Sequence, residues 1–323
     1  MHSPLLSRRT LIAALLATSV ALPCAAQAPL ELKIMAPAAP GGGWDGAARS
    51  LQQVMAATGA AKSVQVVNVP GAGGTVGLAQ FVNQAKGDGN QLLVMGITMV
   101  GAVLTNKSPV TLDAATPLAR LTADSLVVVV PANSPHKSLK DLAAALKADT
   151  SKVVWAGGSA GGADHILAGL VSKAAGGGAT PLNHGAFSGG GRGLAEMLGG
   201  RVTAGVSGYN EFESQIKAGK LRALAVSSAK RMEGVDVPTL KEQGLDVELL
   251  NWRGIMGGPG ISAAQKAALS AAIAKAVKSE EWAKVRKARG WEDAYLDADA
   301  FAAFLKADQQ RVKDVLGSVG LVK

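Results

Sequence analysis

Glycine-rich segments that directly follow apolar runs are the parts of this sequence best suited to chemistry. They occupy residues 37–45, 68–75, 157–164, 183–191 and 207–210, and a helical pattern follows each of them. Glycine allows bare backbone N–H groups to approach a ligand, and the first turn of a helix leaves N–H groups without partners. The helix dipole adds partial positive charge at the same place. Several such helix starts around one space would bind an anion without a metal or a lysine.

The candidate ligand-binding residues lie in four of these segments and after one further apolar run. They are Gly41, Gly42, Gly43, Trp44, Asp45, Pro70, Gly71, Ala72, Gly73, Gly74, Thr98, Ser159, Ala160, Gly161, Gly162, Asp164, Ser207 and Asn210. Asp45 is expected to pair with Arg49 one helical turn later, or to contact a ligand. Asp164 could cap its helix, or contact a ligand amine, hydroxyl or bridging water. Arg192 and Arg253 are candidates for meeting a second carboxylate.

Two other candidates have both a structural and a functional interpretation. Trp44 could pack into the core or form an apolar wall beside a ligand. His165 stands early in a predicted helix, where a histidine more often has a structural role than a ligand-binding one.

Enzymatic functions fit the sequence less well. Residues 157–161 read GGSAG, which matches the G-x-S-x-G motif of serine hydrolases between a strand and a helix. No histidine follows His184, although the base of such an enzyme is normally found late in the chain. Residues 71–77 resemble a dinucleotide-binding loop, but Pro70 precedes it and no acidic residue ends a following strand. We therefore predict binding without catalysis, and a secreted serine hydrolase acting through Ser159 remains the alternative.

The composition argues against metals, cofactors and nucleic acids as partners. The chain has one cysteine and four histidines, with no pair of histidines at helical spacing, so neither a metal site nor a cofactor is expected. The net charge is +9, but the basic residues are dispersed, and the dense stretch at residues 284–289 has the pattern of a solvated helix face.

The first 28 residues have the order of a secretory signal peptide. Arg8 and Arg9 precede an apolar run over residues 11–22, and small residues follow up to Ala28. The arginine pair resembles a twin-arginine signal. Cleavage is expected after Ala26 or Ala28, and no later apolar run reaches 18 residues. The sequence thus predicts an exported protein.

Alternating apolar runs and helical patterns predict an α/β fold with two parallel or mixed sheets flanked by helices. Strands are predicted at residues 30–36, 64–69, 92–96 and 126–130, among others, and the sequence after residue 257 is predicted to be helical. Two extended segments, 126–130 and 251–257, lie at block boundaries and are predicted to be hinge crossings. Residues 29–126 with 254–323 would then form one lobe, and residues 127–253 the other.

Three motifs resemble those of the receptors of tripartite tricarboxylate transporters, the TctC or Bug family. They read PGGGWD (residues 40–45), NVPGAGG (68–74) and GGADH (161–165), and the resemblance extends over essentially the whole chain after the signal. It implies a two-lobed periplasmic binding protein of type II, expected to be a monomer. Such a receptor captures a small organic carboxylate and delivers it to the membrane permease subunits of the transporter.

The resemblance also implies how the ligand is held. One carboxylate would lie in a pincer between residues 41–45 and 70–74, and the other lobe would contribute residues 159–164 and 207–210. The GWD sequence at residues 43–45 leans toward tricarboxylate ligands. Ala160 and Ala163 depart from the more polar residues expected in the second lobe.

Overall fold

The structure is a computed structural model that describes residues 30–177, 182–187 and 190–322. The predicted signal peptide lies outside the described residues. Within the described residues, no helix combines the length and the apolar character needed to cross a membrane.

The first half of the fold is built on three parallel strands in the order β2-β1-β3. These strands are β1 (Glu31–Ala36), β2 (Ser63–Asn68) and β3 (Gln91–Gly96). Strand β9 (Leu250–Gly257) pairs antiparallel with β3 on one side and with β4 on the other. The helices of this half are α1 (Gly43–Ala57), α2 (Thr75–Gln84), α3 (Ile97–Thr105), α8 (Ala263–Val277), α9 (Glu280–Arg289) and α10 (Ala298–Ser318).

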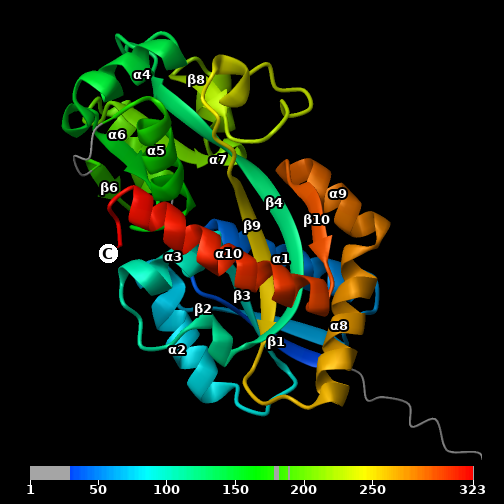
Figure 1. Cartoon of the computed structure of the whole chain (residues 1–323). Helices are drawn as coiled ribbons and strands as arrows, with labels where there is room; N and C mark the ends of the chain where they lie inside the picture. The colour runs from blue at the N-terminus through cyan, green and yellow to red at the C-terminus, as the bar shows by residue number, and fades with distance from the viewer. Residues whose placement is uncertain (1–29, 178–181, 188–189, 323) are drawn as a thin grey trace, which may run out of the picture.

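Strand β4 (Thr116–Pro131) connects the two halves of the molecule (Figure 1). Its residues 116–125 pair with β9 and with β10 (Glu292–Leu296). Its residues 126–131 pair instead with β7 (Ala204–Gly208) and β8 (Leu221–Val226). The predicted strand at residues 126–130 is therefore the second part of a longer strand that passes from one sheet to the other.

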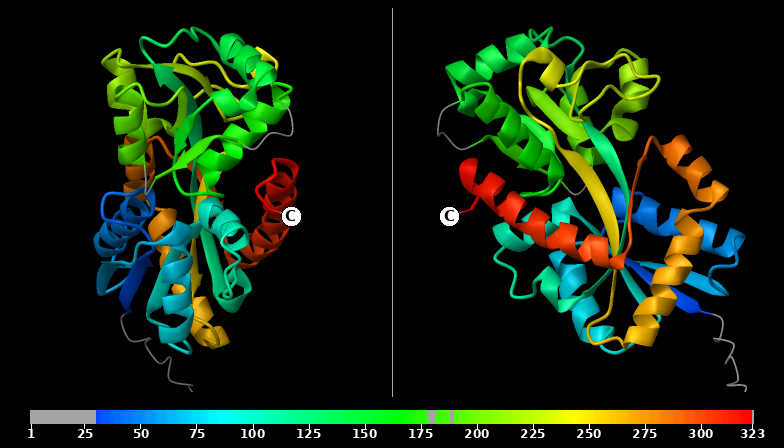
Figure 2. Two further views of the ribbon diagram at one scale, coloured as in Figure 1. Left: turned by 90° about the vertical axis from the view of Figure 1, so that its left-hand side faces the viewer. Right: turned by 45° about the vertical axis from the view of Figure 1, so that its right-hand side comes forward.

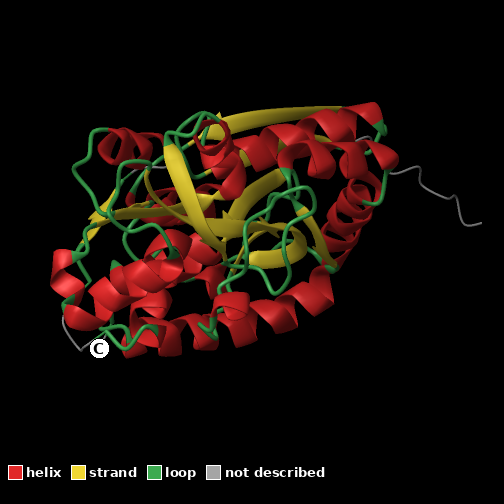
Figure 3. Cartoon of the chain, turned by 90° about the horizontal axis from the view of Figure 1, so that it is seen from above, coloured by secondary structure: helices red, strands yellow, loops and turns green. Residues whose placement is uncertain are grey.

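The second half contains three further strands that run parallel in the order β7-β5-β6. Strands β5 (Trp155–Gly157) and β6 (His184–Ala186) are short. The helices here are α4 (Leu139–Ala148), α5 (Ala163–Ala174), α6 (Gly190–Leu198) and α7 (Tyr209–Lys217). Single 3-10 turns occur at Ala72–Gly74, Leu112–Ala114, Thr150–Lys152 and Lys241–Gln243. Helices flank the strands when the molecule is seen from above (Figure 3).

The strand directions make the carboxyl-terminal edges of the parallel strands in the two halves face each other. Strand β3 is antiparallel to β9, which is antiparallel to β4, so β1 to β3 run in the same direction as β4, toward the second half. Strand β7 is antiparallel to β4, so β5 to β7 run toward the first half. Ligands of parallel sheets collect at the carboxyl ends of strands. Both sets of carboxyl ends therefore point toward the boundary between the halves.

Helix α10 also links the halves. It lies beside β4 and extends toward α5 (Figure 2), where the Val319 side chain lies against Gly169. Within α10, the Asp308 carboxylate accepts a 2.8 Å hydrogen bond from the indole Nε1 of Trp252 in β9. Helix α10 is thus packed against the first sheet and against α5 of the second half.

Several elements of the fold were not predicted from the sequence, among them helix α3 and strand β6, which lies within the segment 183–191 that was predicted to follow a strand. The first part of β4 and strand β10 were not predicted either. The first part of β4 contains Arg120 and Asp124, and these charges interrupt the apolar pattern that indicates a buried strand. Strand β10 stands between α9 and α10, where only helices were predicted. It has a mostly exposed or half-buried sequence and is a strand because it pairs with β4.

Candidate ligand-binding site

The first glycine segment is held in shape by Asp45. This buried carboxylate accepts hydrogen bonds from the Gly41 backbone N–H (2.9 Å), the Asn68 amide (2.9 Å) and the Arg49 guanidinium (3.0 Å). Asn68 also donates to the Ala38 carbonyl, so the segments that follow β1 and β2 are tied together. Hydrogen bonds from Arg49, Gly41 and Asn68 outweigh the effect of burial and keep the pKa of Asp45 below its usual value. Asp45 therefore positions the loop, and the predicted pair with Arg49 is confirmed.

Helix α1 starts at Gly43 with no side-chain cap, because its N-cap residue is Gly42. The first N–H groups of the helix consequently have no side-chain acceptor from the cap position. The Arg253 guanidinium lies directly beneath this turn, since a Cβ on Gly43 would be 2.9 Å from its Nη2 atom. The start of α1 thus combines open amides with a nearby positive charge.

The backbone of the second glycine segment has left-handed dihedral angles. Gly71, Ala72, Gly73 and Gly74 all have positive φ, and that of Ala72 is 47°. A left-handed conformation is costly for a residue with a Cβ, so Ala72 is held by its surroundings, including a 2.9 Å bond from Asn106 to its carbonyl. The indole of Trp44 packs against Gly74, where a Cβ would lie 2.7 Å from the ring. Trp44 is 9% exposed and joins the first two glycine segments by packing.

The third glycine segment, after β5, meets the first half directly. A Cβ on Gly73 would lie 3.6 Å from the Ser159 Cβ. Gly101 of α3 and Gly161 are in closer contact, because a Cβ on Gly101 would lie 1.9 Å from the Gly161 carbonyl oxygen. The Ala163 N–H donates to Thr98 Oγ1 at 3.2 Å, so Thr98 supplies an acceptor at the start of α5.

A buried ion pair lies where the two halves join. Arg253 on β9 donates to Asp124 on β4 at 2.6 Å, and both side chains are almost fully buried. Burial, opposed by Arg253, raises the pKa of Asp124. The carboxylate Oδ2 lies close to Gly208 at the end of β7, as does Asn210 Oδ1. The positive end of the pair thus lies below α1 and the negative end beside the start of α7.

Asp164 lies in the first turn of α5 and accepts a 2.7 Å hydrogen bond from the Gly158 N–H through Oδ2. Its side chain is half-buried and keeps some exposure to solvent. Burial, followed by the charge of Glu211, raises its pKa to about 7, with smaller opposing effects from Gly158 and Arg253. Glu211 accepts a 2.7 Å hydrogen bond from the Ser207 hydroxyl. The wall formed by the second half is therefore rich in carboxylates.

His165 and His184 stack face to face with ring centroids 4.0 Å apart. The Gly161 N–H donates to His165 Nδ1, and both ring nitrogens of His184 are buried without a partner among the described residues. Burial lowers the pKa of His165 to about 4 and that of His184 to about 3. Both rings are therefore neutral at physiological pH. Because His165 bonds the backbone rather than Ser159, it does not act as the base that the hydrolase alternative needs.

The structure brings most predicted site residues to the facing edges. Residues 41–45, 70–74, 158–164 and 207–210 all lie there. Several of them have internal partners. Asp45 binds its own loop, Thr98 binds Ala163, Ser207 binds Glu211, and Asp164 binds Gly158. The Arg192 side chain lies outside the described part of the chain.

Three residues of this region were missed by sequence reasoning, namely Asp124, His184 and Glu211. The signal for Asp124 was an acidic residue beside the apolar run of residues 126–130. His184 stands in a glycine-rich segment, and its partner His165 is brought to it only by the fold. No group of three metal-ligating side chains is found among the described residues.

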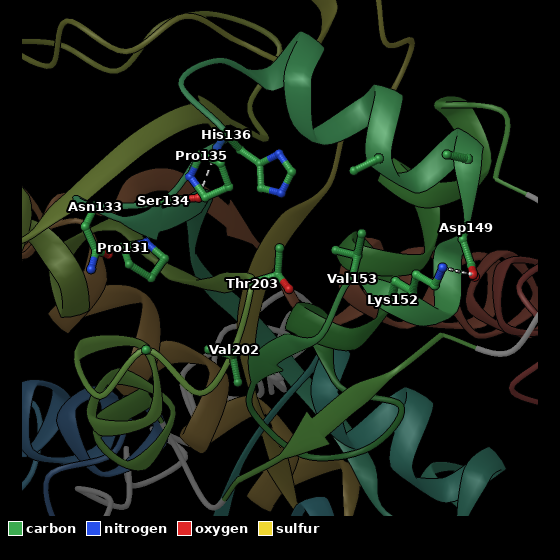
Figure 4. Close-up of a pocket in the computed structure, with 13 residues that line it drawn as sticks. Pro131, Asn133, Ser134, Pro135, His136, Asp149, Lys152, Val153, Val202 and Thr203 are labelled. Atoms are coloured by element: carbon green, nitrogen blue, oxygen red, sulfur yellow. Dashed lines mark hydrogen bonds and ion pairs between the residues drawn. The ribbon is translucent and has the colours of Figure 1, made fainter.

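A surface hollow of about 740 Å³ lies elsewhere on the second half (Figure 4). It is lined by the end of β4 at Pro131, by His136, and by the residues before β5 and β7 such as Val153 and Thr203. Lys152 and Asp149 form an ion pair at its edge. This hollow is at the amino ends of β5 and β7, away from the glycine segments, and it is separate from the candidate site.

Comparison with known proteins agrees with this geometry. Residues 47–321 match the family described as tripartite tricarboxylate transporter family receptor. A UPF0065 protein from the TAR-I ttuE-ttuC' intergenic region of Agrobacterium vitis is 29% identical over 320 residues, covering 95% of this chain and 91% of that protein.

Two solved structures are similar over most of their length. The periplasmic binding protein BugD superimposes with a TM-score of 0.80 at 25% identity, covering 91% of this chain and 98% of that one. A TctC solute binding protein from Polaromonas gives a TM-score of 0.67 at 27% identity, covering 89% and 98% of the two chains. The chain therefore belongs to the tripartite tricarboxylate transporter receptor family, whose members are substrate-binding receptors and not enzymes.

Proposed function

We propose that this protein is a periplasmic receptor that captures a small organic carboxylate between two lobes and delivers it to the membrane permease subunits of a tripartite tricarboxylate transporter. The lobes are residues 29–126 with 254–323, and residues 127–253. The protein is exported by its signal peptide, which is cleaved after Ala26 or Ala28, and it acts as a monomer without metal or cofactor.

One observation carries this proposal: glycine segments at helix starts of both halves approach each other, with Gly73 opposite Ser159. Backbone N–H groups at the starts of α1 and α2 supply donors for one carboxylate without a side chain in the way. Arg253 beneath Gly43 adds positive potential at the same place. The packing of Trp44 against Gly74, which brings residues 41–45 and 70–74 together, supports the pincer that the family resemblance implies.

Closure follows from contacts that exist only when the halves meet. Gly161 approaches Gly101, and Ala163 donates to Thr98 across the boundary. A ligand that bridges both halves favours this closed arrangement, because only there can both sets of donors reach it. The permease would then recognise the closed shape.

A thermal-shift and calorimetry screen of the mature protein against mono-, di- and tricarboxylates tests the proposal. We expect a saturable shift with at least one carboxylate, and quenching or enhancement of tryptophan fluorescence at the same concentrations. A parallel assay with an activated ester should show no hydrolysis by the wild-type protein or by Ser159→Ala. Ester cleavage that disappears in Ser159→Ala, with no carboxylate bound, would instead support the hydrolase.

A further inference from the structure

The charges on the two sides of the candidate site differ in sign. On the side of the first half, the donors are backbone N–H groups above the Arg253 guanidinium. On the side of the second half stand the carboxylates of Asp124, Asp164 and Glu211. Arg253 is the cation that faces this group, and it is already paired with Asp124. The four side chains together therefore carry a net charge of about −2 when all are ionised.

Asp164 is the carboxylate placed to meet a ligand. Its Oδ2 atom accepts from the Gly158 N–H, one residue before Ser159, which faces the pincer at Gly73. Among the ion pairs of the described residues, none includes Asp164 or Glu211. His184 also lies near this position. Its Nε2 is beside Gly157, and its ring is neutral. Asp164 thus keeps partial exposure and has no cation of its own.

The Asp124–Arg253 pair is oriented with the same polarity. Its guanidinium lies beside Gly43 at the start of α1, and its carboxylate lies beside Gly208 at the start of α7. The pair is a buried dipole whose positive end lies beside Gly43 of the first half and whose negative end lies beside Gly208 of the second half. A bridging ligand fits this field when its anionic group points to the first half and a cationic group points to the second.

From this arrangement we propose that Asp164 determines specificity and that the ligand is an aminocarboxylate, with its carboxylate in the pincer and its protonated amine at Asp164. This deepens the proposed function and rests on it. A second ligand carboxylate at Asp164 would place like charges together in a poorly solvated space. A hydroxyl would accept or donate a hydrogen bond there but would leave the excess negative charge uncompensated. Tricarboxylates, which the GWD sequence at residues 43–45 favours, are therefore disfavoured as ligands of this site.

The pH dependence of binding follows from the same group. Burial and Glu211 raise the pKa of Asp164 to about 7, so a large share of it is protonated at pH 6 and most of it is ionised at pH 8. A ligand amine needs the ionised form, whereas a dicarboxylate is better tolerated by the protonated form. Affinity for an aminocarboxylate should therefore increase between pH 6 and pH 8, and affinity for a dicarboxylate should decrease.

Calorimetry on the mature protein tests this with ω-amino acids of three to six carbons, L-aspartate, L-glutamate, and the dicarboxylates of the same chain lengths. At pH 8 we expect an aminocarboxylate to bind at least tenfold more tightly than the dicarboxylate of equal length. Asp164→Asn should weaken the aminocarboxylate at least tenfold, strengthen the dicarboxylate, and remove the pH dependence. The matched control is Asp299→Asn, which makes the same change in the first turn of α10 at an exposed position and should alter none of these values.

The outcomes separate the two proposals. A wild-type protein that binds a dicarboxylate more tightly than every aminocarboxylate, with the same preference in Asp164→Asn, keeps the receptor function and overturns the aminocarboxylate assignment. A protein that binds no carboxylate of either kind overturns both. If Asp164→Asn does not fold, the pH dependence of the wild-type protein decides, because an aminocarboxylate affinity that falls from pH 6 to pH 8 contradicts the assignment.

Discussion

Replacing Gly101 by alanine should prevent closure while leaving the fold intact. Gly101 lies in α3, and a Cβ there would be 1.9 Å from the carbonyl oxygen of Gly161, a backbone atom that cannot rotate away. Ordinary contacts of a Cβ begin at 3.4 Å, so the two segments must separate before the residue fits. Forcing an extra methyl into a packed contact typically costs about 1–3 kcal/mol.

That cost falls on the closed form if the halves can move apart about β4 and β9. A penalty of about 1–3 kcal/mol on the closed form lowers ligand affinity about five- to hundredfold, since each 1.4 kcal/mol is a factor of ten. In the open form the new methyl meets nothing, and alanine favours a helix over glycine by about 0.5–1 kcal/mol. The ligand-free melting temperature should therefore stay the same or rise slightly.

Calorimetry and small-angle X-ray scattering check this expectation. Gly101→Ala should weaken binding and abolish the compaction that ligand causes in the wild-type protein. The control is Gly317→Ala, a glycine in α10 whose added Cβ would meet nothing within 4 Å. Equal affinity in the two variants would refute the reasoning, because it would mean that the Gly101–Gly161 contact is absent from the ligand-bound form.

Three further predictions concern the pincer, the stacked histidines and the buried Asp124–Arg253 ion pair. Gly73→Val should reduce carboxylate affinity at least tenfold in calorimetry. Gly73 has φ of 63°, and a Cβ there would lie 2.5 Å from that of Ala102. Normal affinity would show that the second glycine segment does not bind the ligand. Burial lowers the pKa of His184 to about 3, so its stabilising effect is complete above the unfolded value of about 6.5 and is lost as the pH falls toward 3. Urea unfolding at several pH values should show that the free energy of unfolding of His184→Phe changes less with pH than that of the wild-type protein. Between pH 6 and 4 the difference in slope should be up to about 1.4 kcal/mol per pH unit. An unchanged slope would contradict the buried neutral ring. Arg253→Met should lower the unfolding free energy by about 3–5 kcal/mol, since it leaves the Asp124 carboxylate buried and unpaired, and adding Asp124→Asn should recover part of the loss.

The glycine segments could be predicted from the sequence because their signals are local. An apolar run, a glycine turn and a helical pattern follow one another within about fifteen residues. The structure starts α1 at Gly43, α5 at Ala163 and α7 at Tyr209, within or directly after the predicted segments. The pairing of Asp45 with Arg49 was also predictable, because residues four apart meet on one face of a helix.

The partners of the charged residues could not be predicted, because they are distant in the sequence. Asp124 and Arg253 are 129 residues apart and meet only because β4 and β9 pair. The same applies to Thr98, whose hydroxyl accepts from the N–H of Ala163, 65 residues later in the sequence. A side chain's availability for a ligand depends on which neighbours the fold supplies, and no local pattern contains that information.

The two halves of the site divide recognition in a way that follows from their donors. In the proposed site, backbone amides around Gly43 and Gly73 of the first half would hold any carboxylate, and a side-chain substitution elsewhere would not change them. The second half would contribute side chains, above all Asp164, whose charge changes with a single substitution. A receptor built in this way keeps the anion-binding half constant and changes ligand by altering residues 158–164. Exchanging that loop between relatives should therefore transfer the preference for the distal ligand group, whereas exchanging residues 70–74 should change affinity for all carboxylates alike.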